Sequence, residues 1–343
     1  MINIKKLNKI SNKFSKKLPN LQIQISSPNL DSDFVFSSSK PDQVFHSASV
    51  GKLATAIVII KAIEQNRIDW ETKVIDLLNE EVYKGLFISL DMVTISHLLS
   101  HTSGVNDYFE GILSNGKNIL EDLIANPTHL YTPIELLNLT RYHQKPIGNP
   151  GEKFLYSDTG FVLLGMIAET VFKKPFHIVL REELFALLEM NDTGLCFYDE
   201  AFEAQNLAPV IIKKIDIHTY QSLSVDYAGG GLYTTTSDLT KLIQAVKNLT
   251  VISKESYLKM CSFNNRFEKG LHYGLGLMEV HFEEFFFLLK GLPRLQGHLG
   301  VLGVHAWFDK STDTTYIINV GDIKKMVPSF QLLIQLVQVM NRS

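Results

Sequence analysis

One stretch of this sequence, Leu53–Ile63 (LATAIVIIKAI), is apolar on almost every face that a helix could present. A helix on a protein surface carries one apolar stripe, so an apolar surface all round is typical of a helix enclosed by protein. The run falls well short of the ~20 residues that a membrane-spanning helix needs. The chain must therefore enclose this helix with other structure. Its 343 residues, 45% of them hydrophobic, are sufficient for one large core or two modest ones.

Strands are expected before this helix, and helices after it. Leu21–Ser26 and Phe34–Ser38 are separated by turn residues and predict a strand pair. The long middle of the chain, to about Asp226, is expected to be mostly helical, with no obvious β-hairpin. Its helix candidates are Ile95–Leu99, Pro133–Thr140, Thr159–Phe172 and Ile178–Leu188.

The last part of the chain changes character at about Tyr273. Its β-like runs are Leu275–Phe282, Phe285–Leu289, Gly303–Phe308 and Thr314–Val320. An amphipathic helix, Phe330–Met340, ends the chain and is expected to lie on the resulting sheet.

Together these elements predict an α+β fold, in which an antiparallel sheet is flanked by helices and interrupted by a large, mostly helical insertion. Both ends of the chain contribute to one body, so we expect a single domain over residues 1–343. Its α/β lobe is expected at about 1–60 plus 227–343, and its helical lobe at about 61–226.

Charge and composition exclude several classes of partner. The formal net charge is −3 and the pI about 6.4, so no chain-wide basic field is available to bind nucleic acid. No run is long enough for an integral membrane segment. The lysines among residues 5–17 alternate with apolar residues, which favours an amphipathic helix with a solvated lysine face over a membrane-binding one. The two cysteines, Cys196 and Cys261, have neither disulfide-framework nor zinc-site spacing.

The N-terminal segment also lacks the continuous apolar region of a signal peptide. This predicts a cytoplasmic protein, or an extracytoplasmic one if a signal has been removed. The sequence leaves the oligomeric state open.

A serine and a lysine three residues apart share one face of a helix, so the lysine can reach the serine hydroxyl. This S-x-x-K pattern occurs at Ser37/Lys40, Ser49/Lys52, Ser114/Lys117 and Ser256/Lys259. Only Ser49/Lys52 stands at the first turn of the helix predicted to be buried. Free backbone N–H groups there favour an oxyanion, and burial disfavours a lysine cation. Lys52 is thus a candidate neutral base for Ser49, the alternative being a capping serine and a surface lysine.

Two further segments are candidates for the same site. Tyr156-Ser157-Asp158 precedes the helix candidate at Thr159 and is expected to cap it, while the tyrosine phenol could also relay a proton. His298 lies between two glycines in the β-rich region, where a ligand could approach the backbone closely. A single histidine in a strand is, however, more often structural.

The three segments, in this order, resemble the motifs of the serine β-lactamase and D-Ala-D-Ala carboxypeptidase superfamily, which includes the penicillin-binding proteins. Those motifs are matched by Ser49-x-x-Lys52, Tyr156-Ser157-Asp158 and His298-Leu299-Gly300. Two more segments, Leu98–Gly104 and Ala228–Thr235, match landmarks of the class C-like branch and are expected to be scaffold. The resemblance covers about residues 20–340.

The resemblance implies a β-lactamase/transpeptidase-like fold and a serine hydrolase that acts without metal or other cofactor on a small molecule or peptide. Ser49 would be acylated, and Lys52 and Tyr156 would share the base and acid work. The backbone N–H groups of Ser49 and Val301 would form the oxyanion hole. Asp158, His298 and Gly300 would complete the substrate side of the site.

Two residues depart from the family pattern. Asp158 replaces a common asparagine, and His298 stands where many members carry lysine, leaving a weaker, pH-dependent positive charge for a substrate carboxylate. Both departures weaken the case for penicillin hydrolysis and leave D-Ala-D-Ala-type peptides, β-lactams and small esters as open substrates. A rival interpretation is a sensor or binding module for cell-wall fragments or β-lactams that is acylated without turnover.

Overall fold

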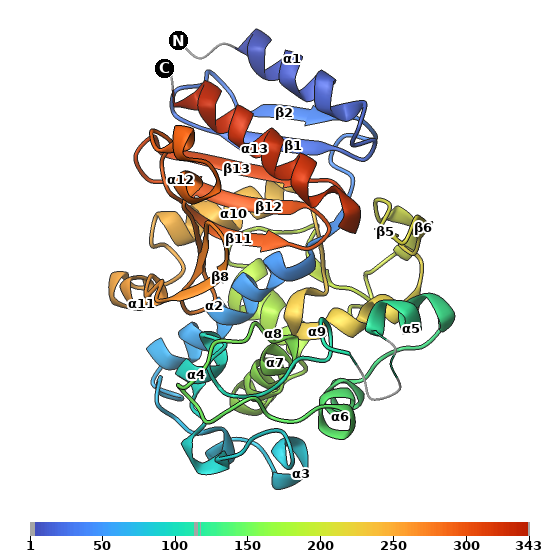
Figure 1. Ribbon diagram of the computed structural model, residues 1–343, viewed down its shortest axis with the longest axis vertical. Coiled ribbons are helices and arrows are strands. Elements are labelled where there is room, and N and C mark those ends of the chain that lie inside the picture. Colours follow the sequence, from blue (N-terminus) through green and yellow to red (C-terminus); the bar gives the residue numbers. More distant parts are fainter. Residues whose placement is uncertain (1–3, 113–115, 117, 342–343) are drawn as a thin grey trace.

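The structure is a computed structural model that describes residues 4–112, 116 and 118–341 (Figure 1). Within these residues, an antiparallel sheet of eight strands has the order β2-β1-β13-β12-β11-β10-β9-β8. The first two strands come from the start of the chain and the other six from its last third. They are β1 Gln22–Ser26, β2 Phe34–Ser37, β8 Asn265–Glu268, β9 Leu271–Tyr273, β10 Met278–Val280, β11 Leu295–Gly300, β12 Val304–Asp309 and β13 Thr314–Asn319.

Helices cover both faces of this sheet. On one face lie α1 (Ile4–Ser15) and α13 (Met326–Met340). They share a core with the strand side chains that point to this face, such as Trp307 and its cross-strand partner Tyr316. On the other face, α10 (Thr236–Lys247) and α2 (Gly51–Glu64) share a core with the alternate residues, among them Ala306. The period-two alternation of strand side chains thus divides the sheet between two cores.

The remaining helices lie mainly on the far side of α2 from the sheet (Figure 1). At the centre, α2 packs against α7 (Asp158–Phe172), and the side chains of its residues 51–60 are all buried. The other helices are α3 Glu80–Tyr83, α4 Ile95–Leu99, α5 Ile119–Ala125, α6 Pro133–His143, α8 Phe176–Leu180, α9 Tyr227–Gly230, α11 Lys254–Met260 and α12 Phe282–Phe285. A small three-stranded sheet has the order β3 (Phe45–His46), β7 (Leu232–Thr234), β4 (Gly194–Leu195). A second small sheet pairs β5 (Ile211–Ile212) with β6 (Ile215–Asp216).

Most of the expected elements are confirmed. The strand pair β1–β2 is antiparallel, the apolar segment after Lys52 is the buried helix α2, and the fold is α+β with helices flanking an antiparallel sheet. The lysine-rich segment is the amphipathic helix α1, whose Leu7, Ile10 and Phe14 are buried while its lysines face solvent. The division into two lobes stays a prediction. Ser114 and Lys117 lie outside the described residues.

Two expectations about β structure are wrong. Phe285–Leu289 is not a strand, because the chain leaves the sheet after β10 through α12 and a 3₁₀ turn at Phe287–Leu289. Phe287 and Leu288 are 71% and 68% exposed, so the apolar run has no sheet partner, and a short apolar run does not distinguish a strand from a helical turn. The helical middle does contain a hairpin, β5–β6. Each of its strands has only two residues, too few to leave a periodic pattern in the sequence.

None of the helices in the described ranges has the length and apolar character needed to cross a membrane.

Candidate active site

Ser49 stands in a tight turn between strand β3 and helix α2. Residues Ala48–Val50 form a 3₁₀ turn, and α2 begins at Gly51. Ala48 adopts a positive φ of 46°. The turn is fixed from the other side by Gly230, because a Cβ atom there would lie only 2.4 Å from the Ala48 carbonyl oxygen. This close approach of two backbones requires glycine and sets the position of the serine relative to the 226–231 segment.

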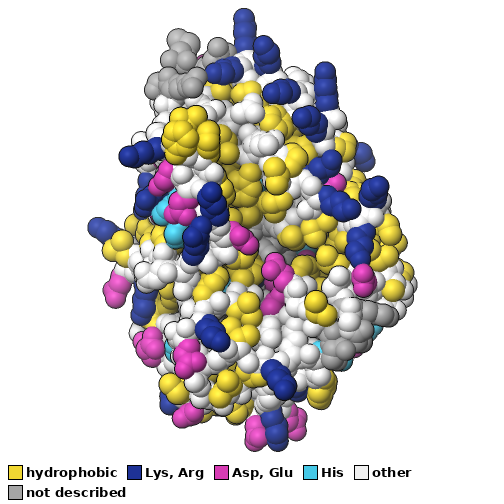
Figure 2. All heavy atoms as spheres, viewed as in Figure 1, with side chains coloured by type: hydrophobic (Ala, Val, Ile, Leu, Met, Phe, Trp, Pro, Cys, Tyr) yellow, Lys and Arg dark blue, Asp and Glu magenta, His cyan; other side chains and the backbone are white. Residues whose placement is uncertain are grey.

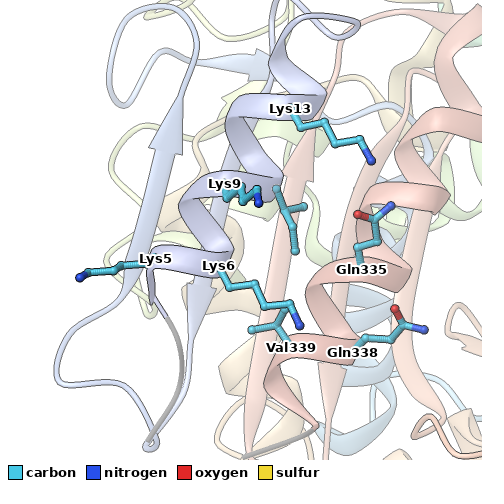
Figure 3. A pocket seen from close by; sticks show the side chains of 8 residues that line it. Lys5, Lys6, Lys9, Lys13, Gln335, Gln338 and Val339 are labelled. Atoms are coloured by element: carbon cyan, nitrogen blue, oxygen red, sulfur yellow. The ribbon is translucent and has the colours of Figure 1, made fainter.

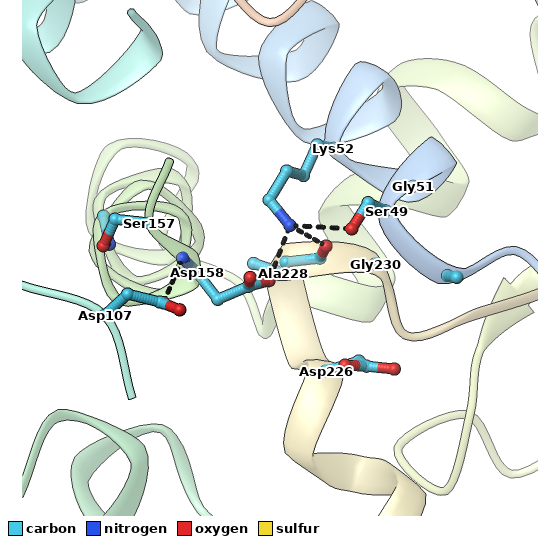
Figure 4. A network of polar contacts seen from close by, with 12 residues as sticks. Ser49, Gly51, Lys52, Asp107, Ser157, Asp158, Asp226, Ala228 and Gly230 are labelled. Carbon is cyan, nitrogen blue, oxygen red and sulfur yellow. Dashed lines mark hydrogen bonds and ion pairs between the residues drawn. The ribbon is translucent and has the colours of Figure 1, made fainter. Parts of the chain in front are cut away.

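Lys52 is fully buried and connects three parts of the chain (Figure 4). Its Nζ atom lies 2.5 Å from Asp158 Oδ1, 2.6 Å from the Gly229 carbonyl oxygen and 3.3 Å from Ser49 Oγ. An ammonium group has three N–H donors and no acceptor, so these three oxygens satisfy it completely. The alternative of a surface lysine is wrong. The role of Lys52 as a neutral base for Ser49 stays a prediction.

Asp158, the first residue of α7, brings a carboxylate to Lys52. Ser157 caps the helix, accepting a hydrogen bond from the Gly160 N–H at 3.3 Å, as the sequence predicted. The backbone N–H of Asp158 donates to Asp107 Oδ1 at 2.7 Å, and both carboxyl groups are buried. The ion pair of Asp158 and Lys52 is therefore enclosed by protein, where the loss of either partner leaves an uncompensated charge.

Tyr156 covers the Lys52 side chain. The Lys52 Nζ lies 4.7 Å from the centre of the Tyr156 ring, and the tyrosine is 7% exposed. Burial and the charge of Asp158 raise the pKa of the phenol well above its usual value, although the Ser49 hydroxyl acts in the opposite direction. The phenol oxygen lies near Ser49 but makes no hydrogen bond of ordinary geometry. It is thus a protonated group that can still engage a ligand.

His298 lies on strand β11 and is completely buried. Its Nε2 atom is 3.4 Å from the hydroxyl of Tyr273, whose ring packs edge-on against Tyr156. Burial, followed by the charge of Lys52, lowers the pKa of His298 to about 3. The expectation of a pH-dependent positive charge at this position is therefore wrong near neutral pH, because His298 is uncharged there.

Gly300 and Val301 follow His298 at the end of β11, next to the serine turn. A Cβ atom on Gly300 would lie 2.8 Å from the Ser47 carbonyl oxygen and 2.9 Å from the Ala48 Cβ, so glycine permits the close approach of this strand. In the part of the chain that the structure describes, no backbone carbonyl accepts a hydrogen bond from the N–H of Ser49 or of Val301. Their use as an oxyanion hole stays a prediction.

His101, from the Leu98–Gly104 segment, has a structural position. Its Nδ1 accepts the Ser157 N–H at 3.0 Å, and its ring packs 4.4 Å from that of Tyr156. Burial lowers its pKa well below the usual value. The neutral ring holds the Tyr156-Ser157-Asp158 segment in place, as expected of a scaffold.

Two carboxyl groups near the ion pair, those of the buried Asp107 and the largely buried Asp226, carry no recognisable sequence motif. Burial, followed by the charge of Asp158, raises the pKa of Asp107 to about 7, and the same two causes raise that of Asp226 to about 7. Asp226 precedes α9 and lies 3.4 Å from His46, whose pKa burial lowers to about 4. Only the nearness of Asp107 to the Leu98–Gly104 landmark could have pointed to it.

We expect Asp226→Asn to make stability less dependent on pH. The raised pKa of Asp226 means that its contribution to stability is complete below about pH 4 and is lost as the pH rises through about 7. Asparagine does not ionise, so the variant should match the wild type at pH 4.5 and exceed it at pH 8, by on the order of a few kcal/mol. Urea unfolding at both pH values measures this. Asp31→Asn, at an exposed carboxylate, is the control. An equal difference from wild type at both pH values would contradict the assignment.

A small apolar cavity adjoins the serine turn. Its lining includes Ala48, Val301, Phe109, Leu223 and Asp226. In Figure 2, acidic side chains lie beside a hollow near the middle of the face shown.

A larger groove, of about 800 Å³, lies between α1 and α13, on the far side of the sheet from α2 (Figure 1, Figure 3). Its rim carries Lys5, Lys6, Lys9 and Lys13. None of the candidate catalytic residues lines it, so the groove is separate from the serine site.

Comparison with known proteins connects this site with a family. The Beta-lactamase family model matches residues 35–321. Penicillin-binding protein 4* of Bacillus subtilis is 27% identical over 253 residues, which are 69% of this chain and 52% of that protein. The chain thus spans about half the length of the curated relatives it matches.

Solved structures share the fold over nearly the whole chain. D-amino acid amidase from Ochrobactrum anthropi, solved with D-phenylalanine, has a TM-score of 0.80 at 19% identity and covers 98% of this chain and 99% of its own. A D-stereospecific amidohydrolase from Streptomyces has a TM-score of 0.79 at 21% identity, covering 95% and 98%. These likenesses show that the chain has the β-lactamase/transpeptidase-like fold, and at identities below 25% they show the fold alone.

Proposed function

Because this chain belongs to the beta-lactamase family, we propose that it is a serine hydrolase that forms an acyl-enzyme at Ser49 and acts on amides or esters. The observation that carries the proposal is the meeting of Ser49, Lys52 and Tyr156 in one buried cluster. A serine hydroxyl is a weak nucleophile until a neighbouring group accepts its proton. In this cluster Lys52 Nζ, 3.3 Å from Ser49 Oγ, is placed to accept that proton, and the Tyr156 phenol is placed to donate one.

Asp158 prepares Lys52 for its task as a base. The 2.5 Å contact between Lys52 Nζ and Asp158 Oδ1 allows the proton to pass from nitrogen to carboxylate. The transfer leaves a neutral amine beside Ser49 and a neutral carboxylic acid at Asp158. The free amine then accepts the Ser49 proton as the serine oxygen forms its bond to the substrate carbonyl carbon.

Two atoms of the substrate change charge in the reaction, the carbonyl oxygen and the leaving nitrogen or oxygen. Backbone N–H groups act on the first, and Tyr156 acts on the second. The N–H groups of Ser49 and Val301 would donate to the carbonyl oxygen as it becomes negative, an interaction whose loss elsewhere costs about 10²–10³ in rate. The Tyr156 phenol passes a proton to the leaving amine or alcohol and regains it from Lys52. Water then takes the place of the leaving group and releases the acyl group from Ser49.

The charges around the cluster favour substrates without a carboxylate. Asp158 balances Lys52, Asp107 and Asp226 ionise near pH 7, and His298 is neutral. Glu110 is a further acidic residue near the cluster. Desolvation, followed by the negative charge of Asp158, raises the pKa of Glu110. A substrate carboxylate would thus meet acidic groups and no cationic histidine. We propose amides and esters without a carboxylate as substrates, a class to which the D-amino acid amidase of similar fold lends support by its name.

A matched pair of esters tests this preference. The p-nitrophenyl esters of butyrate and of succinate have acyl chains of similar size, and only the succinate ester carries a free carboxylate. We expect kcat/KM at pH 8 to be at least about tenfold higher for the butyrate ester, equivalent to ~1.4 kcal/mol. His298→Lys should reduce the ratio of the two kcat/KM values, because the added cation would attract the carboxylate of the succinate ester. Equal or faster hydrolysis of the succinate ester by the wild type would exclude the proposed preference.

A further inference from the structure

We propose that His272, His281 and Glu284 form a binding site for a divalent transition-metal ion of the Zn²⁺ class, separate from the serine site. His272 comes from strand β9, His281 follows β10, and Glu284 lies in α12. One potential ligand atom from each residue lies within 4.8 Å of the others. The three side chains are between 12% and 31% exposed, so an ion has access from solvent.

Two of the three ligand–ligand distances are near those of a tetrahedral ion, and the stacked rings of His272 and His281, with centres 4.1 Å apart, would have to turn to direct a nitrogen each at it. Glu284 Oε1 lies 2.8 Å from His272 Nε2 and 3.2 Å from His281 Nδ1. Ligands of tetrahedral zinc at its usual bond lengths are about 3.4 Å apart. Two imidazoles and one carboxylate are also a ligand set that zinc accepts in proteins, leaving a fourth position for water.

Both ring nitrogens of His281 face carboxylate oxygens. Its Nδ1 faces Glu284 at 3.2 Å, and its Nε2 faces Glu279 Oε1 at 2.7 Å. An ion bound between His281 Nδ1 and Glu284 would leave the Nε2–H of the ring to donate to Glu279, which would fix the orientation of the ring.

The surrounding contacts are those of an outer ligand shell. Histidines that bind metals usually donate their second N–H to a carboxylate, as His281 can to Glu279. Glu279 is held in turn by Gln296 Nε2 at 2.8 Å, and the second oxygen of Glu284 accepts the Gly270 N–H at 3.2 Å. In Figure 2, histidine side chains reach the surface beside acidic ones on the α12 side of the molecule.

The site would clamp the edge of the main sheet. His272 pairs across the strands with Glu279, and α12 follows β10 after one residue, so an ion would join β9 to the β10–α12 turn. Tyr273, the neighbour of His272 on β9, points to the opposite face and packs against Tyr156. A bound ion would therefore steady the strand that carries a wall of the serine site.

Zinc binding by the full-length protein tests the proposal. After treatment with a chelator, the protein is titrated with Zn²⁺ in competition with a chromophoric chelator, and the melting temperature is recorded with and without Zn²⁺. We expect one zinc ion per chain and a higher melting temperature with zinc. His281→Asn and Glu284→Gln should each lower affinity by about a hundredfold or more, and Glu279→Gln by about tenfold.

His218→Asn is the matched control, because His218 also contacts a carboxylate, Asp216 Oδ1 at 2.9 Å, but without a second histidine. It should bind zinc like the wild type. Circular dichroism without zinc shows whether each variant is folded, and Glu279→Gln provides a milder change if a ligand variant is not. Absence of zinc binding by the wild type, or unchanged affinity in folded His281→Asn and Glu284→Gln proteins, would overturn the proposal.

Discussion

Replacing Ser49 with alanine should lower kcat/KM for any ester or amide substrate by a factor on the order of 10⁴ or more, because the variant has no atom to carry the acyl group. Loss of the nucleophile alone removes nearly all of the rate supplied by a cooperating group of catalytic residues. Ester hydrolysis measured by release of p-nitrophenol gives the ratio directly.

Stability should hardly change in Ser49→Ala, since Lys52 retains its contacts with Asp158 and Gly229. Ser37→Ala is the matched control. Ser37 belongs to the same S-x-x-K pattern, but its hydroxyl donates to the Lys40 carbonyl oxygen in an exposed turn. It should retain wild-type activity. A Ser49→Ala protein as active as Ser37→Ala would exclude Ser49 as the nucleophile.

Replacing Lys52 with alanine should affect both activity and stability. Activity should fall by about 10²–10⁴, the usual contribution of a general base. Stability should fall by about 3–5 kcal/mol, because Asp158 would remain buried without its cation. Urea unfolding and ester hydrolysis measure the two effects.

The double variant Lys52→Ala with Asp158→Asn separates the two effects. Removing the carboxylate charge should restore part of the lost stability, since neither partner then carries a charge into the core. Activity should remain as low as in Lys52→Ala, because no base is present. Recovery of activity together with stability would mean that Lys52 stabilises the fold and takes no part in the reaction.

The sequence pointed to Ser49 as the candidate nucleophile because local context is informative at that point. An S-x-x-K pair that opens an apolar helix differs visibly from the pairs at Ser37 and Ser256, and the order of the later motifs agreed with it. The sequence did not show which groups surround Lys52, because Asp158 and the Gly229 carbonyl are 106 and 177 residues away along the chain.

The other differences have the same physical origin, which is tertiary context. His298 looked like a titratable cation, but its complete burial keeps it neutral. Asp107 and Asp226 are ordinary acidic residues in the sequence, and only the fold places them near Asp158. Phe285–Leu289 has strand-like composition, yet the chain needs a turn there to pass from β10 to β11.

Acyl-enzyme formation at Ser49 is the central claim, and intact-protein mass spectrometry after rapid mixing with p-nitrophenyl acetate tests it most directly. We predict one acetyl group per chain within the first turnover, mapped to Ser49 by peptide analysis and absent from Ser49→Ala. Rapid loss of the acetyl group would indicate a hydrolase, and a long-lived adduct would indicate the sensor. Acetylation of Ser49→Ala to the same extent, or turnover without acetylated Ser49, would contradict the account.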